Sequence, residues 1–222
     1  LEAIPVVDEL GRLVGRITID DIIDVIKEEA DKDYQLAAGI SQDVEADDSI
    51  LELTKARLPW LVLALLGGFI AVKVSGLYEG AMEEYGVLFF FTPLIAAMAG
   101  NVGVQSSAII VQGLANDTLS GSVWQRLFKE VKLSLLNGLI LALILLLGSH
   151  FLLGVEYIIG ITVSIALISV IVIASLIGTF VPITLNKYGI DPALATGPFI
   201  TTSNDIFGIL IYFSIAKVIL GF

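Results

Sequence analysis

The stretch "YIIGITVSIALISVIVIASLIGTFVPITL", residues 157–185, runs for 29 residues without a charged side chain. A helix that crosses a bilayer needs about 20 mainly apolar residues. The whole chain has the same character, because 56% of its 222 residues are hydrophobic and its mean hydropathy is +0.92. Ordinary soluble domains are less apolar. The stretch therefore predicts a membrane-spanning helix.

Four further segments meet the same criterion of length and composition. The five predicted spans cover about 58–78, 87–113, 133–153, 157–185 and 193–220. Most of the Trp and Tyr residues near these segments fall close to predicted ends, as interfacial aromatic residues do. We expect an all-α membrane protein with five transmembrane helices, in contact with membrane lipid.

Charge divides the chain into two parts. Residues 1–57, which we call the head, hold 15 acidic and 6 basic side chains, a net charge of −9. Residues 58–222 hold 8 acidic and 6 basic side chains, a net charge of −2. This balance argues against a nucleic-acid partner and favours cations. The absence of Cys excludes disulfides, thiolate metal sites and Cys nucleophiles.

The basic residues predict an orientation. Six of those in the loops and flanks fall on the side of the head, and two fall on or near the other side. By the positive-inside rule the N-terminal head is cytoplasmic and the C-terminus lies outside. We expect a multi-pass protein of the inner (plasma) membrane of the cell. The opposite-side loop "YEGAMEEYG", residues 78–86, is either a solvated loop or an acidic mouth that attracts cations.

Two of the predicted spans look interrupted. The second contains Pro93 and two glycines within "TPLIAAMAGNVGVQSS", and the fifth contains Gly197 and Pro198 before "FITTSND". Irregular backbone at membrane depth is tolerated where it is buried in protein or faces water. Broken helices beside polar residues point to an ion or substrate path. Asp205 lies in this part of the fifth span, with no basic residue nearby in sequence.

The head begins with a predicted hairpin and helix. Two β-branched runs in "IPVVDELGRLVGRIT" are joined by a Gly-containing turn, and "IDDIIDVIKEEA" has apolar residues at helical spacing. Asp21, Asp24 and Glu28 crowd one helical face, where like charges repel. Either full solvation or a bound divalent cation offsets this repulsion. Residues 34–57 follow as a linker helix, capped by Asp47, Asp48 or Ser49.

Together these residues resemble a known family. "VVDELGRLVGRITIDDIIDVI" resembles the closing half of a CBS domain. "AGNVGVQSS" (99–107) and "DPALATGPFITTSNDIFGILIYFSIAK" (191–217) resemble motifs of the MgtE magnesium-channel family. The resemblance implies a C-terminal fragment of something longer: the remnant of a cytoplasmic CBS domain (1–33), a linker or plug helix (34–57) and a transmembrane domain (58–222).

The resemblance also implies a homodimer with a pore between the subunits, lined by the second and fifth spans, and Mg²⁺ as the transported ion. Asp205 matches the pore carboxylate of the family. The matching pore-lining positions are Gly100, Asn101, Gln105, Thr201, Thr202 and Asn204.

Mg²⁺ is also implied as a regulatory ligand that holds the pore shut. The matching acidic positions are Asp21, Asp24, Glu29, Asp33 and the membrane-side Asp191. Lys32 departs from this pattern, because the family typically has another acid there.

The expected function is therefore Mg²⁺ uptake down its electrochemical gradient, gated by cytoplasmic Mg²⁺. An alternative is a secondary transporter of divalent cations such as Co²⁺ or Mn²⁺, coupled to H⁺ or Na⁺ through Asp205. A structural role, with Asp205 hydrogen-bonded to a neighbouring helix, is the third interpretation. An enzyme is not expected, because intramembrane catalysis needs paired acids or a Ser–His pair, and the one His, His150, lies at the outer end of the third span.

Overall fold

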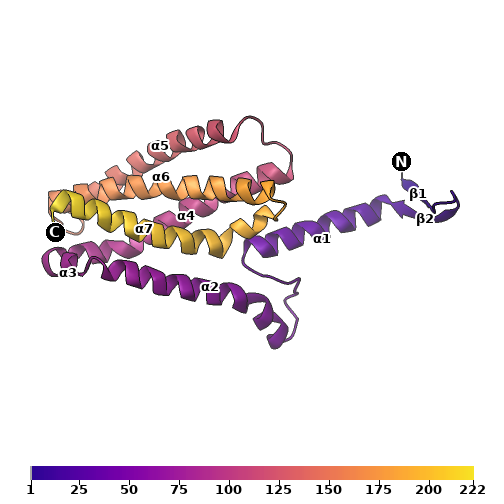
Figure 1. Ribbon diagram of the computed structural model, residues 1–222, viewed down its shortest axis with the longest axis horizontal. Coiled ribbons are helices and arrows are strands. Elements are labelled where there is room, and N and C mark those ends of the chain that lie inside the picture. Colours follow the sequence, from indigo (N-terminus) through magenta and orange to yellow (C-terminus); the bar gives the residue numbers. More distant parts are fainter. Residues whose placement is uncertain (1) are drawn as a thin grey trace.

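The computed structural model describes the backbone of residues 2–222 and the side chains of all of these except 82 and 195. It consists of a bundle of long helices and a head that projects from one end (Figure 1). The part of the head that lies outside the bundle contains β1 (Ala3–Val7), β2 (Leu13–Thr18) and α1 (Ile19–Ala37). The bundle contains α2 (Ile50–Gly76), α3 (Glu79–Tyr85), α4 (Val87–Ala115), α5 (Val123–Phe151), α6 (Tyr157–Lys187), the short 3₁₀ helix η1 (Pro192–Ala195) and α7 (Gly197–Leu220).

Among the described residues, five helices are long and apolar enough to cross a membrane: α2, α4, α5, α6 and α7. This confirms the expectation of an all-α membrane protein with five spans. The N-terminal head and the C-terminus lie at opposite ends of the bundle, as an odd number of spans requires (Figure 1). We call these the head end and the far end.

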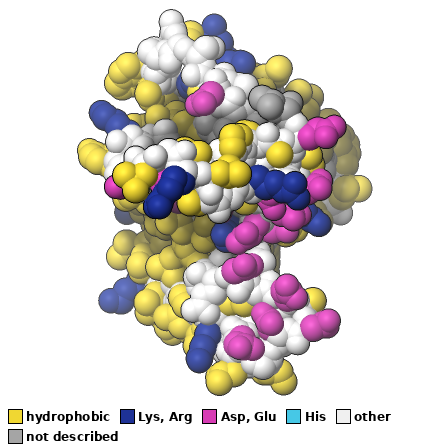
Figure 2. Space-filling model, turned by 90° about the vertical axis from the view of Figure 1, so that its right-hand side faces the viewer, with side chains coloured by type: hydrophobic (Ala, Val, Ile, Leu, Met, Phe, Trp, Pro, Cys, Tyr) yellow, Lys and Arg dark blue, Asp and Glu magenta, His cyan; other side chains and the backbone are white. Residues whose placement is uncertain are grey.

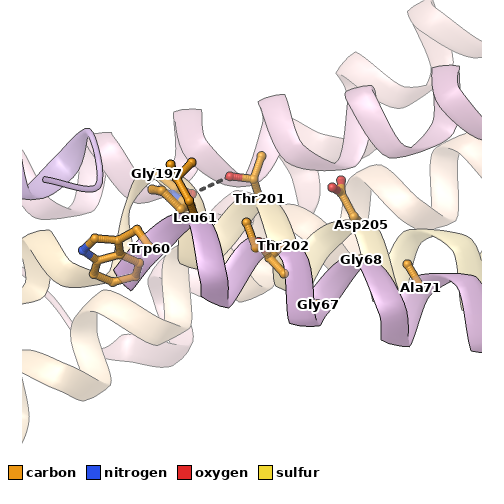
Figure 3. A pocket seen from close by; sticks show the side chains of 11 residues that line it. Trp60, Leu61, Gly67, Gly68, Ala71, Gly197, Thr201, Thr202 and Asp205 are labelled. Carbon is orange, nitrogen blue, oxygen red and sulfur yellow. Dashed lines mark hydrogen bonds between the residues drawn. The ribbon is translucent and has the colours of Figure 1, made fainter. Parts of the chain in front are cut away.

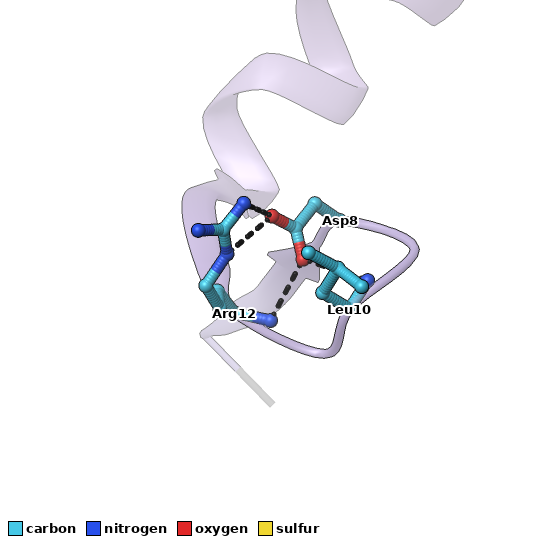
Figure 4. A network of polar contacts seen from close by, with 3 residues as sticks. All are labelled: Asp8, Leu10 and Arg12. Carbon is cyan, nitrogen blue, oxygen red and sulfur yellow. Dashed lines mark hydrogen bonds and ion pairs between the residues drawn. The ribbon is translucent and has the colours of Figure 1, made fainter.

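The predicted hairpin and its following helix are present. β1 and β2 pair antiparallel, with Ala3 opposite Thr18. Asp8 fixes the turn, because its Oδ1 accepts hydrogen bonds from the backbone N–H groups of Leu10 and Arg12 at 3.0 and 2.9 Å. Its Oδ2 accepts from Nε of Arg12 at 2.8 Å (Figure 4). These hydrogen bonds lower the pKa of the Asp8 carboxyl, and those from Arg12 have the largest effect.

The linker differs from the expected single helix over 34–57. α1 continues to Ala37 and ends before Gly39, whose φ of +79° favours glycine. A loop then leads to Ser49, which caps α2 by accepting a hydrogen bond from the backbone N–H of Glu52. Residues 50–57 are therefore the first two turns of the first span rather than part of a separate linker helix.

The predicted break in the second span is wrong. α4 is continuous through Pro93, Gly100 and Gly103. Proline has no N–H and therefore removes only one backbone hydrogen bond from a helix. Packing against neighbouring helices can stabilise a membrane helix at that point. In the fifth span the helix begins at Gly197 with Pro198 in its first turn, where proline is favoured. The irregularity there is the start of α7 and not an interruption.

α6 lies at the centre of the bundle and packs on α4, α5 and α7. Its residues Val163, Leu167, Val170 and Ile171 belong to the main apolar core. Polar contacts between helices add to this packing, since the Oγ atoms of Ser134 on α5 and Ser175 on α6 are 2.5 Å apart. Small and hydroxyl side chains are typical of helix interfaces in membranes. α4, α5 and α7 thus all pack on α6, and we call these four helices the frame.

Candidate ion site between α2, α4 and α7

Asp205 lies in the first half of α7, partly buried. No donor in the described part of the chain hydrogen-bonds its carboxylate, and the three ion pairs found there all lie within residues 8–32. An ionised side chain in a membrane helix is costly without a partner. The interpretation of Asp205 as hydrogen-bonded to a neighbouring helix therefore receives no support from these contacts.

A cavity of about 480 Å³ adjoins Asp205. It lies between α2 and α7 (Figure 3). The residues that line it are Trp60, Leu61, Ala64, Gly67, Gly68 and Ala71 of α2 and Gly197, Pro198, Thr201, Thr202 and Asp205 of α7. Apart from Asp205 and the two threonines these are apolar or glycine. The cavity therefore presents one carboxylate and few other polar groups.

Glycine allows α2 to approach α7 closely. A Cβ at Gly67 would collide with Cγ2 of Thr202, whereas a Cβ at Gly68 would meet nothing within 4 Å. In Figure 3 the side chains of Thr201, Thr202 and Asp205 leave neighbouring turns of α7, and that of Thr202 lies beside Gly67. Gly67 was not among the site residues predicted from the sequence. The glycine pair within an otherwise aliphatic span was the available signal.

Gly100 gives α4 a similar close approach to the other side of α7. A Cβ at Gly100 would lie 2.8 Å from Cγ2 of Thr201 and 3.7 Å from Oδ1 of Asp205. The two sequence motifs, separated by about a hundred residues, therefore meet at the carboxylate. Thr201 also donates a hydrogen bond to the carbonyl oxygen of Gly197 at 2.5 Å, which holds its hydroxyl on its own helix.

Asn204 joins α7 to α4 from within the bundle. Its side chain is 1% exposed, and its Nδ2 donates to the carbonyl oxygen of Ala99 at 3.3 Å. Its Oδ1 has no hydrogen-bond partner among the described residues. Gly103 leaves the space that the amide fills, because a Cβ there would collide with Asn204. Asn204 thus lies behind the cavity and ties the two helices together.

The remaining expected pore residues lie elsewhere on α4. Asn101 and Gln105 are both exposed, unlike the buried Gly100 and Gly103. They share an exposed face of the helix with Phe90 and Ile109. The structure thus places Thr201, Thr202 and Asp205 at the cavity, with Gly100 close to the Asp205 carboxylate, and leaves Asn101 and Gln105 on an exposed surface of α4.

Four of the five expected regulatory acids lie along the head, and the fifth, Asp191, lies at the start of η1. Asp33 and Asp191 are close enough for the charge of Asp191 to affect Asp33. The pKa of Asp33 is raised, mainly by partial burial and to a smaller extent by the negative charges of Asp191 and Glu29. Asp191 also caps η1, since its Oδ1 accepts from the backbone N–H of Ala193 at 2.8 Å.

The other three acids have different surroundings. Asp21 accepts hydrogen bonds from the backbone N–H and the hydroxyl of Thr18, both at 2.7 Å, and these lower the pKa of its carboxyl. Glu29 pairs with Lys32 at 3.1 Å. Asp24 is exposed on α1. Within residues 2–222 no three His, Cys, Asp or Glu side chains converge as ligands of one metal ion.

The C-terminal end of α1 packs against the start of α7. A Cβ at Gly197, whose φ is +51°, would collide with the carbonyl oxygen of Ala37, and a Cβ at Gly39 would collide with the ring of Pro198. The head therefore touches the helix that carries Asp205, two turns before that residue. The carboxylates of the head end are visible in Figure 2, many of them on the lower part of the face shown.

The chain is similar in sequence to known proteins. A family model described as "Divalent cation transporter", MgtE, matches residues 92–215, which is more than half of the chain. The protein named magnesium transporter MgtE of Bacillus subtilis is 38% identical over 215 residues, covering 96% of this chain and 48% of that protein. Those of Thermus thermophilus and Enterococcus faecalis are each 36% identical, over 98% and 99% of this chain and 48% of each relative.

The chain thus spans about half the length of the curated relatives it matches. The region matched by the family model includes most of α4 and most of α7, with Asp205. These are the two helices that meet at the Asp205 carboxylate. With five apolar helices long enough to span a membrane, the chain belongs to the MgtE family of divalent cation transporters, which are not enzymes.

Proposed function

We propose that this chain is the membrane-spanning part of a magnesium transporter that conducts Mg²⁺ down its electrochemical gradient. The observation that carries the proposal is the Asp205 carboxylate, which adjoins a cavity and has no protein donor among the described residues. The name printed for the three relatives, magnesium transporter, supports the choice of ion. An inside-negative potential favours entry by about 2.3 kcal/mol per charge per 100 mV.

The chemistry of Mg²⁺ suits so sparse a site. The ion dehydrates reluctantly and usually keeps several waters while touching one or two carboxylates. A pore for it needs a carboxylate and hydrogen-bond acceptors for the waters around the ion. Asp205 supplies the first, and Thr202, which carries a hydroxyl, lines the same cavity. The amide side chains of Asn101 and Gln105 supply further acceptors at an exposed surface of α4.

A homodimer completes the proposed pore. Each copy would present the exposed face of α4 and the cavity of α7 to a shared two-fold axis, so that two Asp205 carboxylates face one ion. Closed two-fold dimers are the commonest oligomers, and a polar stripe with Asn101 and Gln105 on a membrane helix is costly to leave in lipid. The second copy and the water between the subunits would cover that stripe.

Gating by Mg²⁺ on the side of the head is a further part of the proposal. Asp33 of the head and Asp191 beside α7 repel each other, and a divalent cation between them would remove the repulsion. The contact between Gly39 and Pro198 connects the head to the start of α7. We propose that Mg²⁺ on the head acids, including Asp21, Asp24 and Glu29, favours docking of the head and closes the path.

The proposed location is the plasma membrane, with the head in the cytoplasm and the C-terminus outside. The basic residues of the spans support this orientation, since Arg126, Lys129, Lys132 and Lys187 lie toward the head end of their helices. Residues 1–33 of the head are the remnant of a CBS domain in this proposal. The hairpin and α1 supply the expected strand–turn–strand–helix order.

The decisive experiment replaces Asp205 and measures Mg²⁺ flux into liposomes. We expect Asp205→Asn to lose most of the flux, because the substitution removes the charge and keeps the shape of the side chain. The matched control is Asp117→Asn in the turn after α4, whose φ of +50° asparagine adopts readily. Wild-type flux in the Asp205→Asn protein would refute the pore assignment. Flux that follows an imposed H⁺ or Na⁺ gradient would instead indicate coupled transport.

A further inference from the structure

The first three turns of α5 carry an unusual concentration of positive charge. Arg126, Lys129 and Lys132 are three of the six basic residues in residues 58–222, in a chain whose net charge is −11. They lie at the head end of the helix, before its apolar run begins at Leu133. Exposed Trp124 and Phe128 accompany them. Basic and aromatic residues together are typical of the level of lipid headgroups.

The single acid of this segment does not neutralise the lysines. Oε1 of Glu130 accepts a hydrogen bond from Oγ of Ser106 on α4 at 2.6 Å. Ser106 is only 6% exposed, so the Glu130 carboxylate is turned toward the interior of the bundle. In the described part of the chain, neither Lys129 nor Lys132 forms an ion pair. Their charges are therefore available to a partner outside the protein.

The two lysines face outward from the bundle. Both are exposed, whereas Ser134, on the inner side of the same helix, is buried against Ser175. Nζ of Lys132 lies 4.6 Å from the centre of the Phe128 ring. A cation over an aromatic face is stabilised there, so Phe128 holds this ammonium group at the outer surface rather than against the protein.

The lysines continue directly into an apolar strip. Residues spaced alternately three and four apart lie on one face of a helix, and Lys129, Lys132, Leu136, Leu139 and Leu143 have this spacing. The three leucines are 58–59% exposed. The strip therefore offers two cations about 4.5 Å apart along the axis, at the helical rise of 1.5 Å per residue, above a row of exposed aliphatic side chains.

We propose that this strip of α5 binds an anionic phospholipid from the leaflet on the side of the head. The phosphate of the headgroup lies between the ammonium groups of Lys129 and Lys132, and an acyl chain lies along Leu136, Leu139 and Leu143. Because basic pockets of membrane proteins attract acidic lipid headgroups, charge selects this ligand over a zwitterionic lipid. The site lies on α5, apart from the cavity at Asp205, and does not depend on which ion is transported.

Native mass spectrometry of the purified protein, titrated with phosphatidylglycerol or phosphatidylcholine, tests the proposal. We expect phosphatidylglycerol to bind more tightly, and Lys129→Gln with Lys132→Gln to weaken its binding about tenfold. Binding of phosphatidylcholine is expected to stay unchanged. The matched control removes two lysines near the far end, Lys73→Gln with Lys217→Gln, and should keep the preference for phosphatidylglycerol.

Three results would overturn the proposal. The first is equal binding of the two lipids by the wild-type protein. The lysines would then only follow the positive-inside rule and would not bind a particular lipid. The second is an equal loss of phosphatidylglycerol in the control pair, which would show a general effect of net charge. The third is displacement of the lipid by inorganic phosphate at equal concentration, which would show that the lysines bind a free anion rather than a lipid.

Discussion

α6 and α2 are both long apolar helices, yet they occupy opposite situations in the bundle. In the most apolar 18-residue stretch of α6, 61% of the residues are buried, against 6% in that of α2. α6 packs on three other spans, whereas α2 packs mainly on α7. The cavity at Asp205 lies on the α2 side of α7. The candidate ion site therefore lies between a rigid frame and a helix attached along one face.

The difference has its physical origin in small residues rather than in hydropathy. On α6, Gly178 lies so close to α4 that a Cβ would collide with the backbone of Gly103. On α2, only Gly67 makes such a contact, and it meets the end of the Thr202 side chain. Lipid solvates aliphatic side chains as well as protein does, so close packing decides which helices associate.

The largest expected effect comes from removing core side chains on the two helices. Leu167 of α6 is 2% exposed and Leu65 of α2 is 60% exposed. We expect Leu167→Ala to lower the free energy of unfolding in detergent by about 2 kcal/mol or more, because it leaves a cavity. Leu65→Ala should change it little, since detergent or lipid fills the space. Equal losses in the two variants would remove the distinction between the frame and the attached helix.

The second test adds a methyl group instead of removing several. Gly178→Ala places a Cβ against the backbone of α4, and we expect it to destabilise the bundle by about 1–3 kcal/mol. Gly68→Ala has open space around it and is its control. Thermal unfolding followed by circular dichroism measures both. A Gly178→Ala protein as stable as Gly68→Ala would contradict the close packing of α4 on α6.

The third test compares two tyrosine hydroxyls. The buried Tyr212 donates to the carbonyl oxygen of Leu88 at 2.8 Å within the frame. Tyr78, just after α2, shares a hydrogen bond of 2.8 Å with Ser214 of α7. We expect Tyr212→Phe to cost about 1 kcal/mol of stability, because a buried carbonyl loses its partner. Tyr78→Phe should cost less, and a reversed order would place the stronger attachment at α2.

The smallest expected effect concerns pH at the head. The pKa of Asp33 is raised by burial and by Asp191, so the docked head binds a proton there more readily than a free head does. Docking is therefore favoured at low pH and weakened as the pH rises through the raised pKa of Asp33. The protection of residues 33–39, taken as the ratio of the intrinsic to the observed rate of hydrogen exchange at each pH, should therefore rise on acidification. Asp33→Asn should remove this dependence, and an unchanged dependence would exclude Asp33 as its source.

Much of the architecture could be predicted from the sequence. Runs of about twenty apolar residues identified the five spans, and the spacing of Gly11 and the β-branched residues identified the hairpin. The ends of the helices were less certain. α5 begins ten residues before the predicted span at 133, because Ser122 caps a basic, polar turn that hydropathy does not count. The break expected in α4 is absent, since a proline or glycine signals a local tendency that packing can override.

The sequence by itself determined that the chain crosses a membrane, which residues do so, and that Asp205 is a charge without a nearby countercharge. These are properties of composition along a single segment. Only the tertiary structure decided that Gly100 of α4 and Gly67 of α2 flank α7 near Asp205, that Asn101 is exposed on α4, and that α6 is buried while α2 is not. Such relations depend on how closely two helices approach, and that distance is set by side chains far apart in the sequence.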